Sequence, residues 1–383
     1  MKFDISEYLD ELRPLVNIDC GTYNITGIER VTQLVQQKFE NIGWQVRRYG
    51  CGKAGPGLVI SNQVNNGPID LLILGHVDTS YSEGTAFRRP MSIAGEFAYG
   101  PGIADSKAGL VNLLHALRST DPSDLAELSI AILICPDKHV SSRYSHTMLN
   151  KLAKRAKRCM VLDTGTMGGC LINGRRGMAR YQVDFTGQSA HAAKVGKRKC
   201  SAISEMGQWV VKLEQLAQQW PNIDVNVGYV AGGEKTNQVA EHCQMKFELR
   251  FTSNHYYQQL DQQLRQWSQS PSVEQMHIVL DRKAYKPAFN NASNQSFCEE
   301  LEQAAENLGQ TTKWRSGDKS SNANLVAAHG LACVDGLGAV GQNLNSPEEC
   351  IAIERVLPRI QLLRACIKHL ANAEVPEQEA ETA

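Results

Sequence analysis

The first part of the chain alternates between two hydrophobic patterns, one with helical spacing and one typical of buried strands. Apolar positions recur every three to four residues in several segments, which predicts helices at 4–16, 26–43, 106–118 and 146–157. Short, almost wholly apolar runs predict buried strands at Gly57–Ser61, Ile69–Leu74, Leu128–Cys135 and Arg158–Leu162. This alternation favours an α/β layer in which helices cover both faces of a mainly parallel sheet.

The pattern changes after about Gly174. Two segments, Met178–Phe185 and Gln244–Phe251, alternate apolar and polar residues and predict half-exposed antiparallel strands. Helices are predicted at 201–219 and 255–269, with a further strand at Glu274–Leu280. The α/β pattern then returns, with a helix at 294–308, a strand at 331–334 and a closing helix at 350–372. The sequence therefore predicts a small α+β domain inserted into a larger α/β domain.

These changes set the expected domain boundaries. We predict a larger domain in two parts, at 1–175 and 287–373, and the inserted domain at 176–286. The last residues, 374–383, are rich in Glu and contain no apolar pattern, so we expect a disordered tail.

Composition excludes several classes of protein. The chain has 40 Lys and Arg against 40 Asp and Glu, so its formal net charge is zero and no basic face for nucleic acid is expected. No apolar run approaches the roughly 20 residues of a membrane span, and the amino terminus does not resemble a secretory signal. The 11 cysteines contain no CxxC pair, which favours free thiols. We therefore expect a cytoplasmic protein.

Candidate metal ligands follow three of the predicted strands. His76 ends one apolar run and is followed by Asp78, whose carboxylate can hold the second nitrogen of a ligating imidazole. Asp105 lies in a Gly-rich loop just before a helix, and Asp163 follows another strand. Ligands at the ends of neighbouring strands converge on one edge of an α/β sheet. Each residue alone has an ordinary structural explanation, but their order and spacing together favour a metal site.

These motifs resemble the glutamate carboxypeptidase and aminoacylase family of zinc peptidases and amidohydrolases, which also includes succinyl-diaminopimelate desuccinylase. The resemblance extends from about residue 10 to 372. It rests on His76-Val-Asp78, Gly100-Pro-Gly-Ile-Ala-Asp105, Pro136-Asp137, Asp163, Gly187-Gln-Ser-Ala-His191, Gly232-Gly-Glu-Lys-Thr-Asn237, Arg250, Asp335-Gly-Leu-Gly and Ser346-Pro-Glu.

The resemblance implies a fold and a set of roles. It implies an aminopeptidase-like catalytic domain with a mixed sheet, interrupted by a lid domain through which such enzymes commonly form homodimers. One zinc ion would be held by His76, Asp105 and Asp163, with Asp78 orienting the imidazole. The lid residues His191, Asn237 and Arg250 would bind the carboxylate or the oxyanion of the substrate. An alternative for Arg250 is a plain ion pair with an acid on its own strand.

The chain departs from the family at its catalytic base and second metal site. The family motif Asp-Glu-Glu, which supplies the base and a ligand of the second zinc, is replaced by Asp137-Lys138-His139. Asn345 stands in place of the remaining ligand, a histidine, and Asn322 in place of an expected Asp. His139 could still ligate zinc, but the neutral oxygen of Asn345 suits zinc poorly. We therefore expect one tightly bound zinc ion or none.

Three explanations of Lys138 remain open from the sequence. Lysine has a reference pKa of about 10.4, so its cation cannot accept a proton from water and disfavours a nearby dication. Its ammonium could occupy the second metal position as a surrogate cation paired with Asp105. It could instead be a loop residue if the alignment is shifted by one position, or a desolvated base with a depressed pKa.

Two functions follow, and the sequence favours the first. The first is a non-catalytic relative that keeps the fold and binds an amino-acid-like or N-acyl amino acid ligand. The second is an active single-zinc amide hydrolase, a deacylase or carboxypeptidase, that uses an unusual base. The sequence favours the non-catalytic relative because the base, a ligand and a cation site are lost together.

Overall fold

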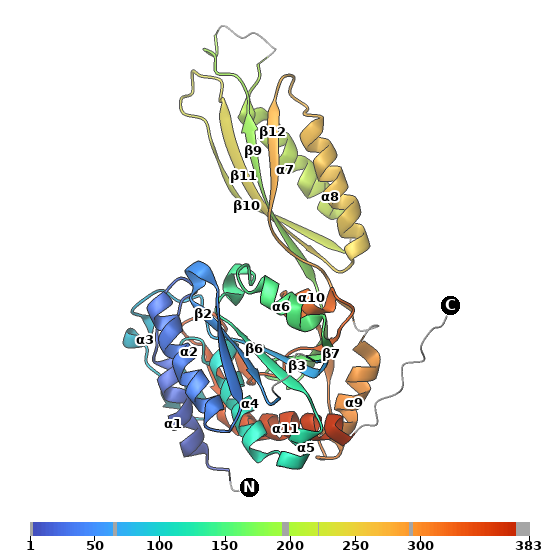
Figure 1. Cartoon of the computed structure of the whole chain (residues 1–383). Helices are drawn as coiled ribbons and strands as arrows, with labels where there is room; N and C mark the ends of the chain where they lie inside the picture. Colours follow the sequence, from blue (N-terminus) through green and yellow to red (C-terminus); the bar gives the residue numbers. More distant parts are fainter. Residues whose placement is uncertain (1–2, 64–66, 194–198, 221, 291–293, 373–383) are drawn as a thin grey trace, which may run out of the picture. The chain divides into compact units, whose positions relative to one another are not determined.

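The computed structural model describes residues 3–63, 67–193, 199–220, 222–290 and 294–372, and it divides the chain into two compact units (Figure 1). The first unit comprises residues 1–174, 291–316 and 321–383, and the second comprises 175–290 and 317–320. The second unit is thus inserted into the first. The short segment 317–320 belongs to the second unit, although the sequence assigned it to the larger domain. The expected tail, 374–383, lies outside the described residues.

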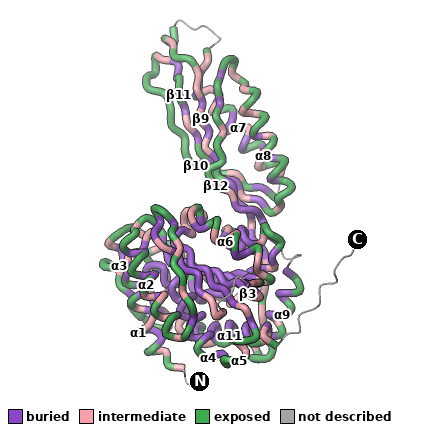
Figure 2. Tube along the Cα trace, in the orientation of Figure 1, coloured by how far each residue is buried: buried purple, intermediate pink, exposed green. Residues whose placement is uncertain are grey.

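The first unit is built on a six-stranded mixed sheet in the order β1-β2-β6-β3-β7-β14. Strands β6, β3, β7 and β14 are parallel, whereas β1 and β2 pair antiparallel. The strands are β1 Gln45–Gly50, β2 Pro56–Ser61, β3 Ile69–His76, β6 Ile130–Cys135, β7 Ala156–Val161 and β14 Ala332–Val334. Every residue of β6 is buried, and Figure 2 shows the strands around β3 as the buried centre of the unit. Strands covered on both faces read as unbroken apolar runs, which is why the sequence predicted them.

Helices cover both faces of this sheet. In Figure 1, α6 and α10 lie above the sheet and α4 and α11 lie below it. The helices of this unit are α1 Ile5–Val16, α2 Ile25–Glu40, α3 Thr85–Arg88, α4 Ala108–Ser119, α5 Pro122–Ala126, α6 His146–Ala153, α9 Gln295–Glu306, α10 Ala323–Ala327 and α11 Val356–Asn372. Smaller strands complete the unit: β4 Ser92–Ala94, β5 Phe97–Tyr99, β15 Gly341–Gln342 and β16 Cys350–Ala352. Two more, β8 Leu171–Arg175 and β13 Trp314–Gly317, belong to it except for their last residues, which are part of the second unit.

Two helix boundaries differ from the prediction by four residues or more. The helix predicted to 157 ends at Ala153, because β7 begins at Ala156 and pairs there with β3. The closing helix begins at Val356 instead of residue 350. Residues Cys350–Ala352 form β16, which pairs with β5 and β15 and places the carboxylate of Glu349 beside the candidate site.

The second unit contains a four-stranded antiparallel sheet in the order β10-β11-β9-β12 with two helices (Figure 1). Its elements are β9 Gly177–Thr186, α7 Ala202–Gln219, β10 Ile223–Gly232, β11 His242–Phe251, α8 Asn254–Gln269 and β12 His277–Lys286. Alternate residues of β9 and β11, such as Tyr181 and Phe247, form a core with Trp209 of α7 and Leu260 of α8. The predicted fold class, an α/β domain with an inserted α+β domain, is confirmed. Strand β10 was not predicted.

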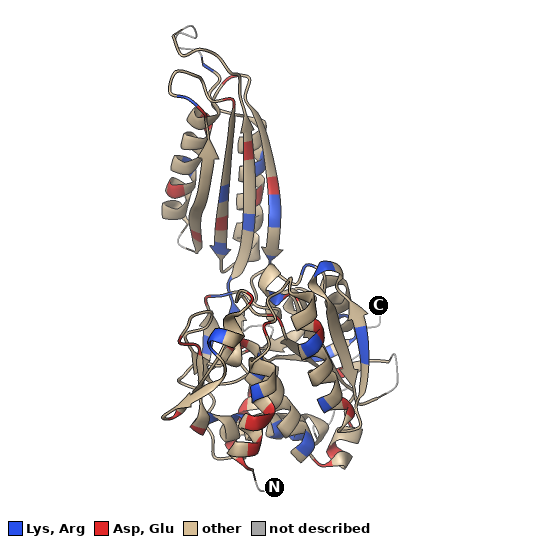
Figure 3. Ribbon diagram, turned by 90° about the vertical axis from the view of Figure 1, so that its left-hand side faces the viewer, with Lys and Arg blue, Asp and Glu red and all other residues tan. Residues whose placement is uncertain are grey.

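Positive and negative charges are mixed along both units. Figure 3 shows Lys and Arg interspersed with Asp and Glu along the ribbon of each unit. Within the described ranges, none of the helices has the length and apolar character needed to cross a bilayer.

A partly buried ion-pair cluster joins three helices of the first unit and predicts a pH dependence of stability. Glu11 of α1 pairs with Lys38 of α2 at 2.9 Å, and with His115 and Arg118 of α4, both at 2.9 Å. Burial raises the pKa of Glu11, but the hydrogen bonds from His115, Arg118 and Lys38 outweigh burial and hold it far below its ordinary value of 4.5. A depressed pKa stabilises the fold above the unfolded-state pKa, and this contribution is lost as pH falls below about 4.5.

Glu11→Gln should therefore lower the free energy of unfolding by about 1–2 kcal/mol at pH 7, since it replaces charged hydrogen bonds in a partly exposed cluster. The difference from the wild type should shrink as the pH falls from 5 to 3. Urea unfolding at pH 7, 5 and 3.5 measures both effects, and Glu7→Gln, exposed on the same helix, is the control. A difference that stays constant with pH would contradict the role assigned to the Glu11 carboxylate.

Candidate metal centre

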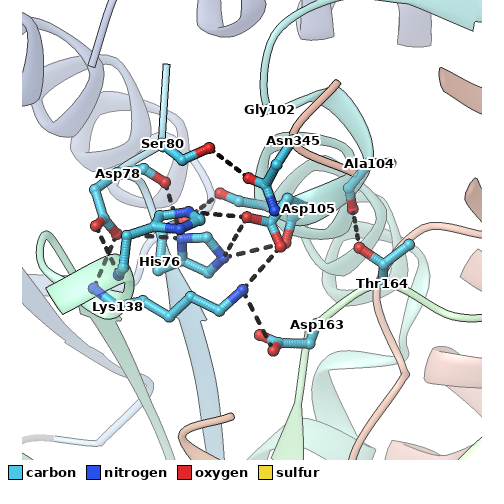
Figure 4. A network of polar contacts seen from close by, with 12 residues as sticks. His76, Asp78, Ser80, Gly102, Ala104, Asp105, Lys138, Asp163, Thr164 and Asn345 are labelled. Carbon is cyan, nitrogen blue, oxygen red and sulfur yellow. Dashed lines mark hydrogen bonds and ion pairs between the residues drawn. The ribbon is translucent and has the colours of Figure 1, made fainter. Parts of the chain in front are cut away.

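The candidate ligands gather at the carboxyl ends of the parallel strands β3, β6 and β7 (Figure 4). His76 is the last residue of β3, and Asp163 follows β7 by two residues. Lys138 and His139 form a short 3₁₀ turn, Lys138–Val140, just after β6. Asp105 lies in the π-helical turn Ile103–Lys107 that leads into α4. Parallel strands end at one edge of the sheet, and ligand sites of α/β folds lie at that edge.

Asp78 orients the imidazole of His76. The Nδ1 atom of His76 lies 3.0 Å from the backbone oxygen of Asp78 and 3.3 Å from its carboxylate. Both partners are acceptors, so Nδ1 carries a proton and Nε2 faces Asp105, 3.9 Å from Oδ2 and 3.1 Å from the backbone oxygen. This is the orientation in which Nε2 can ligate a metal. Burial and the Lys138 charge lower the pKa of His76, but its hydrogen bond to Asp78 and the charges of Asp105 and Asp78 raise it overall.

The same carboxylate of Asp78 also fixes the turn Lys138–Val140. It accepts hydrogen bonds from the backbone N–H groups of Lys138, at 3.0 Å, and His139, at 3.1 Å. The hydroxyl of Thr22 donates a further bond at 2.7 Å. Because Asp78 is fully buried, these bonds determine where the side chains of the turn begin. The local backbone therefore directs Lys138 and His139 toward Asp105.

The ammonium of Lys138 lies between two carboxylates. Its Nζ is 2.8 Å from Oδ1 of Asp105 and 3.4 Å from Oδ2 of Asp163, and Figure 4 shows the side chain extending between them. This is the arrangement that the surrogate-cation hypothesis requires, and a solvent-facing loop lysine would not produce it. Burial lowers the pKa of Lys138, but Asp105 and Asp163 raise it overall, above its usual range. This environment therefore does not give Lys138 the depressed pKa that a lysine base would need.

His139 joins His76 and Asp105 as a possible metal site. The ligand atoms of the three residues all lie within 4.8 Å of one another, and His139 Nε2 is 2.9 Å from Oδ2 of Asp105. Both of these atoms are buried without a well-formed hydrogen bond, as expected of groups that a cation would satisfy. Two imidazoles and one carboxylate match a zinc site with three protein ligands and one open position. The donor set therefore fits one zinc ion, with His139 in the place that the resemblance gave to Asp163.

A second zinc ion does not fit the residues present. Asp163 is occupied by the ammonium of Lys138. Asn345 is exposed, and its side-chain oxygen accepts a 2.5 Å hydrogen bond from Ser80 (Figure 4). Asn322 accepts a bond from Ser142 at 2.7 Å and is part of the buried packing around β6.

Glu349 holds the loop that carries Asp105, and the sequence did not single it out. One oxygen of its buried carboxylate accepts the N–H groups of Ala104 and Asp105, both at 3.0 Å. The other accepts the N–H of Gly102, at 3.3 Å, and the hydroxyl of Tyr81, at 2.6 Å. A carboxylate that directly follows Ser-Pro-Glu and precedes an apolar strand was the available signal. Burial raises the pKa of Asp105, but the Lys138 charge and the contacts with His139 and His76 outweigh burial and keep that pKa well below its ordinary value.

The three lid residues predicted to bind substrate do not lie together in the second unit. His191 and Asn237 are exposed and adjacent, since the N–H of Ala192 donates to the Asn237 oxygen at 2.9 Å. They lie beyond the end of the sheet where His242 pairs with Thr186. Arg250 is eight residues further along β11 than His242, about 26 Å at 3.3 Å per residue. There it pairs with Glu248 at 2.6 Å, the alternative considered from the sequence.

Comparison with known proteins agrees with this geometry. A profile of the peptidase dimerisation domain of the M20 family matches residues 173–276. Carboxypeptidase G2 of a Pseudomonas species is 25% identical over 286 residues, covering 73% of this chain and 68% of that protein. Acetylornithine deacetylase of Proteus mirabilis is 22% identical over 368 residues, covering 90% and 91% of the two chains. The chain belongs to the M20 peptidase family.

A solved structure shows the same fold over the whole length. The aminopeptidase PepT from Bacillus cereus superposes with a TM-score of 0.77 at 21% identity, covering 96% of this chain and 99% of that one. The M20 family comprises metallopeptidases and amidohydrolases, so the metal site has its expected context. The match to the dimerisation domain coincides with the β-sheet unit that is inserted into the first unit.

Proposed function

We propose that this M20 protein is a catalytically inactive or strongly impaired relative that binds an amino-acid-like or N-acyl amino acid ligand. The position of Lys138 carries this proposal. At the position of the family's general base, the chain has an ammonium group donating to Asp105 at 2.8 Å. An ammonium bound in this way has no lone pair with which to take a proton from water.

The same contact supports the loss of the second metal ion. A positive charge a few ångströms from Asp105 and Asp163 neutralises the carboxylates that a second dication would need. His76, Asp105 and His139 would hold a single zinc ion. Such an ion, when bound, polarises a carbonyl or activates a water molecule. In this chain, the residues around the site supply orientation of the imidazole through Asp78 but no carboxylate base at position 138.

Three further observations support ligand binding, a homodimer and a cytoplasmic location. The exposed pair His191 and Asn237 is free to meet a carboxylate or an acyl oxygen. The dimerisation-domain match supports a homodimer formed through the second unit. All 11 cysteines are free, which supports a reducing, cytoplasmic location.

One observation favours the alternative, an active single-zinc amide hydrolase. The cluster of His76, Asp105 and His139 has the donor set of a catalytic zinc site with an open position. The relatives of this chain include carboxypeptidase G2 and acetylornithine deacetylase. Short peptides and N-acyl amino acids are therefore the substrates to test.

Zinc stoichiometry and turnover, measured on the same sample, distinguish the two functions. The purified protein is loaded with zinc, dialysed, analysed for metal, and assayed on N-acetyl amino acids and dipeptides. We expect one zinc ion or none per chain, no turnover, and a rise in Tm with one class of these compounds. Turnover that disappears in His76→Ala would establish the hydrolase instead, and two tightly held zinc ions would overturn the proposal of a lost second site.

A further inference from the structure

Arg359 is a buried guanidinium far along the chain from the metal ligands. It occupies the fourth position of α11 in the first unit and is only 4% exposed. Its Nη2 lies so close to the backbone at Gly165 that a Cβ atom there would approach it to 2.7 Å. Gly165 follows Asp163 by two residues, so the guanidinium packs against the loop that leaves β7. The glycine is required for this close approach.

No described residue compensates this charge. Nη1 is completely buried without a hydrogen-bond acceptor, and no acidic group within the described ranges forms an ion pair with Arg359. Cys366, seven residues along the same helix, is the titratable group beside it, and burial raises the pKa of that thiol to about 12. Burial lowers the pKa of Arg359 to about 10, so at neutral pH the thiol is uncharged and the guanidinium remains a cation. An isolated buried charge costs several kcal/mol unless an opposite charge accompanies it.

Arg359 lines a pocket of about 490 Å³. It lies between the end of α9, the start of α11 and the loop after β7, and its wall carries three cations, Lys313, Arg355 and Arg359. No aspartate or glutamate belongs to its described lining. Arg355 and Arg359 are four residues apart, a spacing at which like charges repel. The exposed Glu354 pairs with Arg355 at 3.2 Å but does not line the pocket.

We propose that this pocket is a binding site for a small oxyanion, a molecule whose phosphate or carboxylate group is held by Arg359. The planar guanidinium offers parallel N–H donors that match both groups. Thr312 and the backbone at Gly168 and Gly169 supply further polar wall. The pocket shares no residue with the metal cluster, so this site is independent of the proposed function.

The guanidinium also lies beside the loop that carries Asp163. Gly165 connects the packing around Arg359 to Asp163, the carboxylate that faces Lys138.

The test measures the full chain by thermal unfolding and titration calorimetry, with inorganic phosphate and with succinate against potassium chloride at equal ionic strength. The two probes distinguish a phosphate from a carboxylate source of the oxyanion. The main variant is Arg359→Met, which keeps the volume of the side chain and removes its charge. Arg355→Gln, on the exposed side of the pocket, is a second variant that does not disturb the buried packing. Arg364→Gln, exposed on the same helix outside this pocket, is the matched control.

We expect one probe to raise the Tm of the wild type and of Arg364→Gln. Arg359→Met should bind it roughly 10- to 100-fold more weakly, the loss expected for a charged hydrogen-bonding partner. Arg355→Gln should bind about two- to fivefold more weakly, as expected for an exposed charge. In chloride alone, Arg359→Met should be at least as stable as the wild type, because a buried uncompensated charge is removed.

Three results would overturn the proposal. The first is an equal Tm in phosphate, succinate and chloride. The second is an anion effect that survives in Arg359→Met but disappears in His76→Ala, which would assign the anion to the metal cluster. The third is a large loss of stability of Arg359→Met in chloride, which would show that the guanidinium is satisfied by the protein itself.

Discussion

Lys138→Glu is expected to make the stability of the protein depend on zinc. In the wild type, the ammonium of Lys138 balances the carboxylates of Asp105 and Asp163 in a space that is almost closed to solvent. The substitution places a third carboxylate there and removes the only cation that contacts both others in the described structure. Breaking a buried ion pair costs about 3–5 kcal/mol. We therefore expect the Tm in EDTA to fall by roughly 5–10 °C.

Zinc should reverse this loss, because the same carboxylates become ligands once a dication is present. The stabilisation grows with the ratio of free zinc to its dissociation constant and reaches about 2.7 kcal/mol at a hundredfold excess. Elemental analysis after dialysis should find more zinc per chain in Lys138→Glu than in the wild type. Thermal unfolding in EDTA and in zinc measures the difference in stability directly.

Two control variants separate the charge of Lys138 from other effects. Lys138→Met removes the ammonium without adding a ligand, so it should lose stability in EDTA and gain little from zinc. Lys157→Glu reverses a charge whose Nζ is also 2.8 Å from a carboxylate, Asp70, but on the surface with 43% of the side chain exposed. Such an exposed pair contributes about 1 kcal/mol or less. If Lys138→Glu bound no additional zinc and unfolded like Lys157→Glu, Lys138 would not be the cation that fills this site.

The parts of the fold that were predicted correctly are those in which local pattern and burial coincide. Leu128–Cys135 reads as a strand because β6 lies inside the sheet and every residue of it is buried. Helices α1, α2 and α7 were predicted within a few residues, since each has a continuous apolar stripe that faces a core.

Two of the strands that were missed, β1 and β10, lie at sheet edges. Strand β1, Gln45–Gly50, contains two arginines and has no buried residue, so no apolar pattern marks it. Strand β10 does alternate at Ile223, Val225 and Val227, but a bulge at Gly228 interrupts the pattern and most of the strand is exposed. Edge strands are held by backbone pairing with one neighbour and can remain exposed, so their side chains need not show the apolar pattern of a buried strand.

The sequence singled out several residues of the candidate site but not how the fold groups them. His76, Asp105 and Asp163 were found because strand-end motifs are local in sequence. Which carboxylate the side chains of Lys138 and His139 reach depends on the tertiary fold. The three possible metal ligands that lie together are His76, Asp105 and His139, whereas the sequence grouped Asp163 with the first two. The same applies to Glu349, whose contact with Asp105 spans 244 residues.

Removing the Glu349 carboxylate is the second change from which we expect a large loss of stability. Glu349→Ala leaves the N–H groups of Gly102, Ala104 and Asp105 without their acceptor inside the protein. Each such group costs about 1–3 kcal/mol when it is buried and unsatisfied. The expected loss in the free energy of unfolding is therefore about 3–5 kcal/mol, allowing for some relaxation of the loop. Zinc binding should fall as well, because the backbone that positions Asp105 is no longer held.

Glu349→Gln distinguishes the acceptor role of this residue from its bulk. The amide oxygen can still accept from Ala104 and Asp105, but the amide nitrogen then faces the N–H of Gly102, so an intermediate loss is expected. Glu348→Ala is the matched control, since this adjacent carboxylate is exposed and should matter by about 0.5 kcal/mol or less. Urea unfolding and zinc analysis of the three variants give the order wild type, Gln, Ala for both properties if Glu349 acts as the acceptor. An alanine variant as stable as Glu348→Ala would mean that the Asp105 loop holds its shape without this carboxylate, and the metal centre would then depend on β3 and the Lys138–Val140 turn alone.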